Sequence, residues 1–197
     1  MDFIKTDIYG ESFNPFKLIG KDWFLLTSGD NRENNTMTAS WGQAGVLWNK
    51  PVFSAYVRTS RKTFELMEKN EYFTASFFDE KYRSALSYCG SHSGRDVDKA
   101  KETGLTPIEI EGVAAFEEAE MVLVCRKLYT SEMQEDDFLD KGLLKFYESD
   151  PFHKAFIGEI ISAYKKLKNK TAFLMRFFFF AFMKSKVEVI VHAFRKS

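Results

Sequence analysis

The sequence predicts a mainly β protein with short helices, arranged as an antiparallel barrel with helical decorations. Three observations predict it. Runs rich in β-branched and aromatic residues recur along the chain, the helical stretches between them are short, and the regular strand-helix alternation of a parallel sheet is missing. At 197 residues, the chain is long enough to bury one good hydrophobic core. We expect one domain over residues 1–166 and an atypical tail over residues 167–197.

The first predicted strand covers residues 35–41, where the residues alternate strictly. One face carries only hydroxyl groups, from Thr36, Thr38 and Ser40, and the opposite face is apolar. This period is typical of a half-buried strand. Four later runs also have strand composition, namely Val52–Arg58, Tyr72–Phe78, Ala119–Leu128 and Phe156–Tyr164.

Two short helices are expected between these strands. Ser60 is placed to cap a helix that runs to Lys69, in which Glu65 pairs with Lys69 at the four-residue spacing. Asp79 is placed to cap the next helix, which Gly90 would end.

The charge balance excludes several classes of function. The chain has 28 basic and 28 acidic residues, so no overall field recruits nucleic acid or an anionic membrane surface. Cys89 and Cys125 have neither metal-ligand nor redox spacing, and the N-terminus lacks the pattern of a secretory signal. We therefore expect a cytoplasmic protein without a metal site or a nucleic-acid partner, in which a local cluster holds any anion.

Residues 57–63 lead from a predicted strand directly into a predicted helix start. A helix N-terminus presents unpaired amide donors and a positive partial charge, which suit a phosphate. Two guanidinium groups and three hydroxyl groups surround this terminus, from Arg58, Arg61, Thr59, Ser60 and Thr63. Arginine offers paired donors that match phosphate oxygens. The alternative is a solvated helix cap with surface arginines.

Residues 89–99 form a second polar segment, with two glycines and small polar residues between helical pieces. Such a loop can bring backbone amides and Lys99 close to an anionic ligand. An ordinary Gly/Ser turn followed by a cap at Asp96 is the alternative. No Walker-type or dinucleotide-binding fingerprint occurs, so neither a nucleotide hydrolase nor a Rossmann protein is indicated.

Taken together, three motifs resemble the flavin reductase-like family, and within it the flavoredoxin-type members. The motifs are Asn35–Trp41, Val57–Thr63 and Cys89–Lys99, and the likeness extends to Trp48, Lys50, Pro51, His153, Gly158 and Glu159. It covers roughly residues 8–165. The resemblance implies an FMN-binding split β-barrel of Greek-key type, usually a homodimer with the flavin near the subunit interface.

The resemblance also implies where FMN would bind, by motif position. A flavin site needs apolar packing together with aimed polar groups. The isoalloxazine and ribityl portions would be lined by Asn35, Thr36, Met37, Thr38 and Trp41. The phosphate end would be held by Arg58, Thr59, Ser60, Arg61 and Thr63, with Lys99, Ser93 and Arg95 approaching from the other loop. His153 would lie near the flavin or the nicotinamide, for binding or proton delivery, or would be a structural histidine.

The implied function is that of an FMN-dependent, flavin reductase-like oxidoreductase. It would accept hydride from NADH or NADPH and pass electrons to a flavin, metal or protein acceptor. Two alternatives stay open. One is a flavoredoxin-like electron carrier that keeps its FMN without efficient NAD(P)H oxidation, and the other is a barrel that binds a different phosphorylated ligand in the same pocket.

The tail departs from the family pattern after Lys166. Its apolar part, Thr171–Met183, is about 13 residues long and contains Arg176, whereas a bilayer-spanning helix needs about 20 apolar residues. We therefore expect no transmembrane segment. Three interpretations remain: an added helix and strand that cover the barrel or a dimer partner, an interfacial membrane segment, or sequence beyond the natural end of the domain.

Overall fold

The computed structural model describes residues 2–167, so most of the predicted tail, residues 168–197, lies outside the described residues. The strands are β1 Phe3–Thr6, β2 Phe24–Gly29, β3 Asn34–Ala39, β4 Gly42–Leu47, β5 Lys50–Arg58, β6 Tyr72–Phe77, β7 Pro107–Ile110, β8 Val113–Phe116, β9 Met121–Glu132 and β10 His153–Lys166. The α-helices are α1 Pro15–Lys17, α2 Lys62–Lys69, α3 Arg83–Ser91 and α4 Lys99–Thr103. The remaining helical segments, of 3₁₀ or π type, are η1 Ile8–Gly10, η2 Leu18–Asp22, η3 Glu80–Tyr82, η4 Glu135–Asp137 and η5 Lys141–Tyr147.

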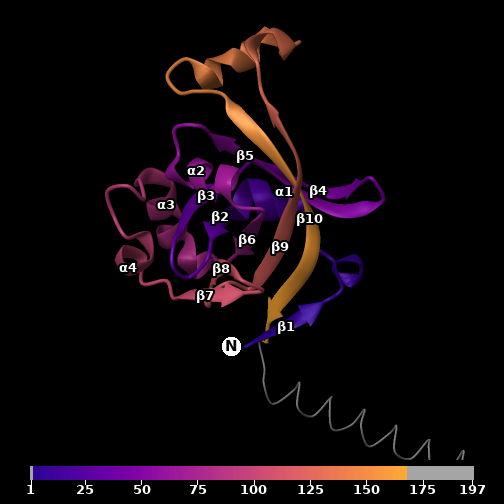
Figure 1. Ribbon diagram of the computed structural model, residues 1–197, viewed down its shortest axis with the longest axis vertical. Coiled ribbons are helices and arrows are strands. Elements are labelled where there is room, and N and C mark those ends of the chain that lie inside the picture. Colours follow the sequence, from indigo (N-terminus) through magenta and orange to yellow (C-terminus); the bar gives the residue numbers. More distant parts are fainter. Residues whose placement is uncertain (1, 168–197) are drawn as a thin grey trace, which may run out of the picture.

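One antiparallel sheet dominates the molecule. Its strand order is β3-β2-β6-β9-β10-β5-β4, with β1 also paired to β10, while β7 and β8 form a separate hairpin. The end strands β3 and β4 do not pair with each other within residues 2–167, so the sheet does not close (Figure 1). This confirms the predicted mainly β fold with short helices, arranged as a split barrel.

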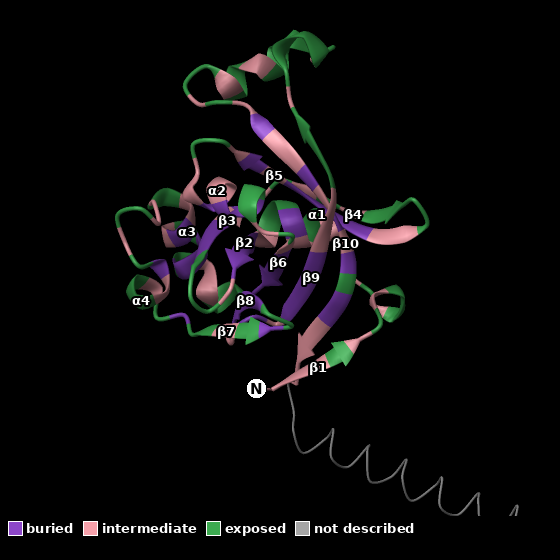
Figure 2. Ribbon diagram, viewed as in Figure 1, coloured by how far each residue is buried: buried purple, intermediate pink, exposed green. Residues whose placement is uncertain are grey.

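Aromatic side chains fill the inner face of this sheet. Phe24, Phe53 and Phe73 are almost fully buried, and the rings of Phe24 and Phe53 meet edge to face with centroids 5.2 Å apart. Gly158 makes close packing possible where the register of β10 shifts, because a β carbon there would lie 2.7 Å from the Phe73 ring. Figure 2 shows the buried residues concentrated in the central strands.

A second core cluster lies on the opposite side of the sheet. It packs α3 and the β7-β8 hairpin against β2 and β9, around Leu25, Leu86 and Val122. Successive residues of β2 therefore enter different clusters, Phe24 the first and Leu25 the second. The helices α2, α3 and α4 lie together at one side of the barrel (Figure 1).

Several local details differ from the sequence prediction. The strand predicted over residues 35–41 is β3, Asn34–Ala39, and its central residues are buried on both faces rather than on one. Helix α3 covers the hydroxyl face, where Thr38 Oγ1 donates to the Leu86 carbonyl. The cap of α2 is Arg61 rather than Ser60, and Glu65 pairs with Lys62 and Arg95 rather than with Lys69.

Glycine does not end α3, contrary to prediction. The helix passes through Gly90 and ends at Ser91. Gly90 has no positive φ and lies against the Thr38 side chain, with an added β carbon 3.3 Å from Thr38 Cβ. A small residue is therefore needed there for close packing of the helix on β3. Asp79 caps the 3₁₀ turn η3, where its carboxylate accepts from the Lys81 amide, whereas the N-cap of α3 is Tyr82.

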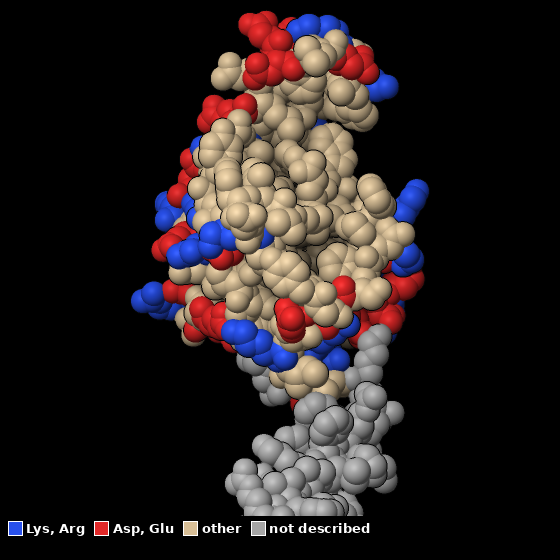
Figure 3. Space-filling model, turned by 90° about the vertical axis from the view of Figure 1, so that its right-hand side faces the viewer, with Lys and Arg blue, Asp and Glu red and all other residues tan. Residues whose placement is uncertain are grey.

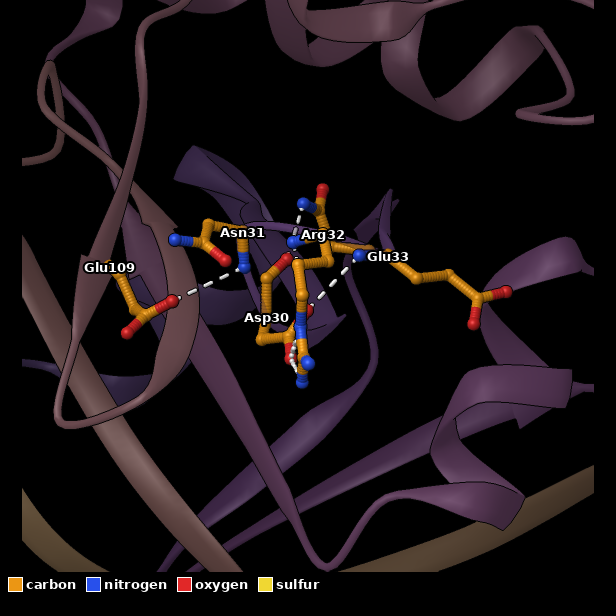
Figure 4. Close-up of polar contacts among 6 residues, drawn as sticks. Asp30, Asn31, Arg32, Glu33 and Glu109 are labelled. Carbon is orange, nitrogen blue, oxygen red and sulfur yellow. Dashed lines mark hydrogen bonds and ion pairs between the residues drawn. The ribbon is translucent and has the colours of Figure 1, made fainter.

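The turn between β2 and β3 fixes where β3 begins. The Asp30 carboxylate accepts from the backbone amides of Arg32 and Glu33 and pairs with the Arg32 guanidinium (Figure 4). These bonds hold the pKa of Asp30 well below its usual range. The Asn31 amide donates to Glu109 on β7, which ties the turn to the neighbouring hairpin.

Between β9 and β10 the chain forms a projection that we call the arm, residues 133–152. It carries η4 and η5 and extends away from the barrel (Figure 1). Most of its residues are exposed (Figure 2). Figure 3 shows that uncharged side chains cover the middle of the face on the β4 side, with charged side chains on the arm above and on the lower part. Within residues 2–167, no helix has both the length and the apolarity to cross a membrane.

Candidate functional site

The predicted strand-to-helix corner is present between β5 and α2. The turn Thr59–Arg61 joins them, and a hydrogen bond of 3.0 Å from the Arg61 amide to the Arg58 carbonyl closes it. No side chain caps α2, so no capping group competes with an external anion for the first amides of the helix.

A cavity of about 260 Å³ opens beside this corner, and we call it the polar cavity. It lies between the start of α2, β3 and the loop that precedes α4. Its lining residues are Asn35, Met37, Ser60, Arg61, Lys62, Thr63, His92, Ser93, Gly94, Arg95, Lys99 and Asp150. The structure thus brings residues from all three sequence motifs to one cavity.

Two cations in the polar cavity have no carboxylate partner among the described residues. The Lys99 ammonium is buried and donates to the carbonyls of Thr36, at 2.9 Å, and Cys89, at 2.7 Å. Burial and the nearby positive charge of Arg61 both lower the pKa of Lys99. The Arg61 guanidinium donates to the Gly90 carbonyl, at 3.2 Å, and to no other group within residues 2–167. An anion between them would neutralise charges that the fold leaves uncompensated.

Asn35 and Thr63 form the floor of the polar cavity. Asn35 Nδ2 donates to Thr63 Oγ1 at 2.7 Å, and both residues are buried. Gly94 presses against this pair, since an added β carbon would lie 1.7 Å from Asn35 Oδ1. The loop can approach β3 this closely only because residue 94 has no side chain.

Side-chain hydrogen bonds and one ion pair hold the residues at the rim of the polar cavity in place. Arg95 Nη1 donates to the Ser60 carbonyl at 3.0 Å, and its guanidinium pairs with Glu65. The Arg95 amide donates to Ser93 Oγ at 3.2 Å. The Ser60 hydroxyl donates to Asp150 of the arm at 3.1 Å. The predicted residues Ser60, Ser93 and Arg95 therefore lie together, already linked to one another or to the arm.

Arg58 has a different environment from Arg61. Its guanidinium donates to two arm carbonyls, at 2.9 Å to Phe146 and 3.2 Å to Pro151. Arg58 Nε also lies 3.5 Å from the Asp150 carboxylate. The guanidinium carbon lies 5.3 Å from the Tyr147 ring centroid, as in a cation–π contact. Arg58 therefore fastens the arm to the strand-to-helix corner.

A second cavity of about 220 Å³, the bridging cavity, shares Met37 and Arg61 with the polar cavity. Its lining residues are Met37, Thr38, Ala39, Ser40, Trp41, Tyr56, Arg58, Arg61 and His153. Its lining is mixed, because aromatic and aliphatic side chains alternate there with Arg58, Arg61 and His153.

His153 is buried in the wall of the bridging cavity. Its Nδ1 lies 3.1 Å from the Tyr147 hydroxyl, and its ring centroid lies 4.9 Å from that of Trp41. Burial, together with the positive charge of Arg58, lowers the pKa of His153 to about 4. The imidazole is therefore uncharged at neutral pH.

A third cavity of about 650 Å³, the apolar cavity, shares Ser40, Trp41 and Tyr56 with the bridging cavity. It lies between the arm, the α1-η2 segment and the start of β4. Its lining residues are Pro15, Phe16, Ile19, Gly20, Ser40, Trp41, Gly42, Gln43, Ala44, Tyr56, Met133, Phe138, Leu143, Phe146 and Tyr147. The three cavities adjoin in series, from cationic to apolar.

Among the predicted site residues, Thr36 and Thr59 line none of these cavities. The Thr36 hydroxyl faces β2, where it bonds Thr27 Oγ1 at 2.9 Å, and only the Thr36 carbonyl reaches the site, through Lys99. Thr59 is exposed in the turn. The other predicted residues all line the polar cavity or the bridging cavity.

Sequence reasoning missed the arm. Asp150, Phe146 and Tyr147 contact predicted site residues, yet the arm has no strand or helix periodicity that would single them out. One feature of the sequence could have indicated them. Phe146, Tyr147 and Asp150 lie shortly before His153 in the chain, so a site that contains His153 is expected to include them.

Comparison with known proteins gives the chain its family. The sequence profile of the flavin reductase like domain matches residues 17–179, which is most of the chain and includes the first part of the predicted tail, residues 167–179. A search of the curated proteins finds no match.

Several solved structures are similar to this fold. Flavoredoxin from Methanosarcina acetivorans is 26% identical with a TM-score of 0.59, over 74% of this chain and 68% of that one. An FMN-binding protein from Thermus thermophilus is 21% identical with a TM-score of 0.60, over 84% and 83%. An NADH:FAD oxidoreductase from Streptomyces globisporus is 19% identical with a TM-score of 0.56, over 74% and 75%. With its split barrel and the extent of the sequence match, the chain belongs to the flavin reductase-like family.

Proposed function

We propose that this protein binds FMN across the polar and bridging cavities and acts as an NAD(P)H:flavin oxidoreductase. The phosphate would lie in the polar cavity and the ring system in the bridging cavity. The single observation that supports this most strongly is the pair Lys99 and Arg61, two cations held together without a carboxylate partner among the described residues. A phosphate supplies the missing negative charge.

The residues around the polar cavity fit a phosphate in chemistry as well as in charge. Ser60 and Thr63 offer hydroxyls at the uncapped start of α2, and Ser93 with Arg95 closes the opposite rim. Asn35, Met37, Thr38 and Trp41 would contact the ribityl chain and the rings. When bound, FMN supplies the redox chemistry, accepting hydride from NADH or NADPH and passing electrons to an acceptor.

Arg58 would reach the phosphate only by giving up contacts with the arm. Its guanidinium already donates to the carbonyls of Phe146 and Pro151 and faces Asp150. We therefore give Arg61 and Lys99 the larger share of phosphate binding. Arg58, with Thr59 beside it in the turn, would contribute less.

We assign His153 a binding role rather than proton delivery. A group that transfers protons efficiently at neutral pH needs a pKa near 7, and the pKa of His153 is lowered to about 4. Its hydrogen bond with Tyr147 and its ring contact with Trp41 suit a residue that orients the wall against which the flavin packs.

We further propose that the protein is a cytoplasmic homodimer. Val46, Leu47 and Trp48 of the β4-β5 hairpin are exposed, and Trp48 packs against the exposed Tyr129 of β9 with ring centroids 6.2 Å apart. This apolar group lies on the side of the molecule that Figure 3 shows as largely uncharged in its middle. Both cysteines are free and buried, which suits a reducing compartment.

The reductase activity has a direct assay. Purified protein is mixed in air with free FMN and either NADH or NADPH, and nicotinamide oxidation is followed by absorbance. We expect FMN-dependent oxidation with at least one of the two donors. Absence of oxidation with both would reject the reductase function while leaving FMN binding to be measured separately.

A second candidate function is an electron carrier that keeps FMN and meets redox partners. The 26% identity to a flavoredoxin favours it. A yellow protein that retains FMN through gel filtration, and that a redox partner reduces much faster than NADH or NADPH does, would select this function over the first.

A further inference from the structure

We propose that the Asp150 carboxylate of the arm and the phosphate of FMN compete for the polar cavity, so that a phosphate entering the cavity displaces Asp150 and loosens the arm. The competition rests on the proposed function, since that function places the FMN phosphate in this cavity. It adds a coupling between cofactor and arm that FMN binding alone does not require.

Asp150 is the negative charge in an otherwise cationic cavity. Among the described residues that line the polar cavity it is the one acidic residue, whereas four are lysine or arginine, namely Arg61, Lys62, Arg95 and Lys99. A carboxylate and a phosphate are both anions that accept hydrogen bonds from hydroxyl and guanidinium groups. The arm therefore places in the cavity a group with the same binding chemistry as a phosphate.

The Ser60 hydroxyl cannot serve both anions. It donates to Asp150 Oδ1 at 3.1 Å, and a hydroxyl group has one hydrogen to donate. Ser60 directly precedes Arg61 at the start of α2, where no side chain caps the helix. A hydrogen bond from Ser60 to a phosphate at this helix start therefore requires that Asp150 lose its own.

The same carboxylate helps to fasten the arm. Arg58 Nε lies 3.5 Å from Asp150 Oδ2, and the Arg58 guanidinium donates to the carbonyls of Phe146 and Pro151. The side chains of Arg58 and Asp150 are only 16% and 37% exposed, so salt screens their charges incompletely. Displacing Asp150 removes its contacts with both Ser60 and Arg58, and the base of the arm is then held less firmly.

Charge repulsion makes the two events oppose each other. A phosphate monoester carries about −1.5 to −2 charges at neutral pH. It would share a cavity of about 260 Å³ with the carboxylate. By thermodynamic reciprocity, the factor by which phosphate weakens docking of the arm equals the factor by which the docked arm weakens phosphate binding. A weakened phosphate contact favours FMN that exchanges with solution, as a flavin reductase needs, over FMN that stays bound.

Limited digestion with trypsin measures how firmly the arm is docked. The protein freed of FMN is digested in inorganic phosphate and in sodium chloride of the same ionic strength, and cleavage after the exposed residues Lys141 and Lys145 is followed by mass spectrometry. Inorganic phosphate supplies the anion without the flavin rings. We expect phosphate to speed cleavage of the arm about fivefold, because a loosened arm opens more often. Equal rates in the two salts would overturn the proposal.

Asp150→Asn removes the negative charge at nearly constant size and keeps an oxygen that can accept from Ser60. In fluorescence titrations we expect this variant to bind FMN about fivefold more tightly than the wild type does, because one repulsive charge is gone, and to bind riboflavin within about twofold of it. Phosphate should speed cleavage of its arm by less than about twofold. A merely structural role for Asp150 would not make FMN bind more tightly.

Glu148→Gln is the matched control, because it removes a charge from the same arm at an exposed residue that does not line the polar cavity. It should leave FMN affinity and phosphate-dependent cleavage unchanged. FMN affinity that is equal or lower in Asp150→Asn, or that rises equally in Glu148→Gln, would overturn the competition and leave the proposed function intact. Failure of the wild type and of Asp150→Asn to bind FMN would instead reject the proposed function, and the competition with it.

Discussion

The polar and apolar cavities are built in opposite ways. The polar cavity is formed mainly by the barrel, its helices and the loop before α4, with Asp150 from the arm at its rim, and short hydrogen bonds fix Asn35, Thr63 and Lys99. The apolar cavity has one wall from the barrel and one from the arm, which is largely exposed and held mainly through Arg58. The cationic groups are therefore positioned by the core of the fold, whereas the apolar surface depends on a peripheral element.

His153 lines the bridging cavity, between the polar and apolar cavities. Its protonation should lower the free energy of unfolding. Its pKa is lowered from 6.5 to about 4, so the unfolded chain binds more protons between these pH values. Stability is therefore fully present above about pH 6.5 and falls as pH drops toward 4, by at most about 3 kcal/mol. Urea unfolding between pH 4 and 7 measures the slope.

In this experiment, His153→Gln is the control that cannot titrate. It should remove most of the pH dependence between pH 4 and 6.5. An unchanged slope in the variant would show that carboxylates, rather than His153, cause the acid sensitivity.

Gly94→Ala tests how rigidly the polar cavity is held. The new methyl group would collide with Asn35 Oδ1 and disturb the Asn35–Thr63 hydrogen bond. We expect FMN affinity to fall about 30-fold, equivalent to about 2 kcal/mol. FMN fluorescence titration measures it. Gly45→Ala is the matched control, because nothing lies within 4 Å of a β carbon there, and a similar loss in both variants would contradict the argument.

Arg58→Ala should loosen the arm, and with it the apolar cavity, while it changes FMN binding in the polar cavity much less. Loss of the arm contacts should speed proteolytic cleavage within residues 133–152 by about tenfold, because an unfastened arm opens more often. FMN affinity should fall by less than tenfold. Arg126→Ala removes a surface ion pair with Glu159 and serves as control for general effects. If FMN affinity instead fell more than tenfold and cleavage were no faster, Arg58 would be a phosphate-binding residue rather than one that holds the arm.

The sequence predicted the polar cavity better than the apolar one, for physical reasons. The strand-to-helix corner depends on neighbours in the chain, so Arg61 and Thr63 could be placed from the order of residue types alone. The apolar cavity is lined by Phe16 and by an arm more than a hundred residues later in the chain, and no local periodicity predicts that they come together.

Helix ends were predicted less well than strands. Ser60 has the side chain of an N-cap, but Asp150 from the arm accepts its hydrogen bond, and α2 begins one residue later than a Ser60 cap implies. Gly90 looked like a helix stop, yet close packing on Thr38 explains the glycine instead. In both cases a tertiary contact overrides the local signal.

FMN and riboflavin, which lacks the phosphate, together separate phosphate binding from ring binding. Each is titrated into the wild-type protein and into Arg61→Ala. Because one charge-assisted contact is worth about 1.5–3 kcal/mol, the variant should lose about 10- to 100-fold in FMN affinity and less than threefold in riboflavin affinity. Equal weakening of the two ligands would contradict the assignment of the polar cavity to the phosphate.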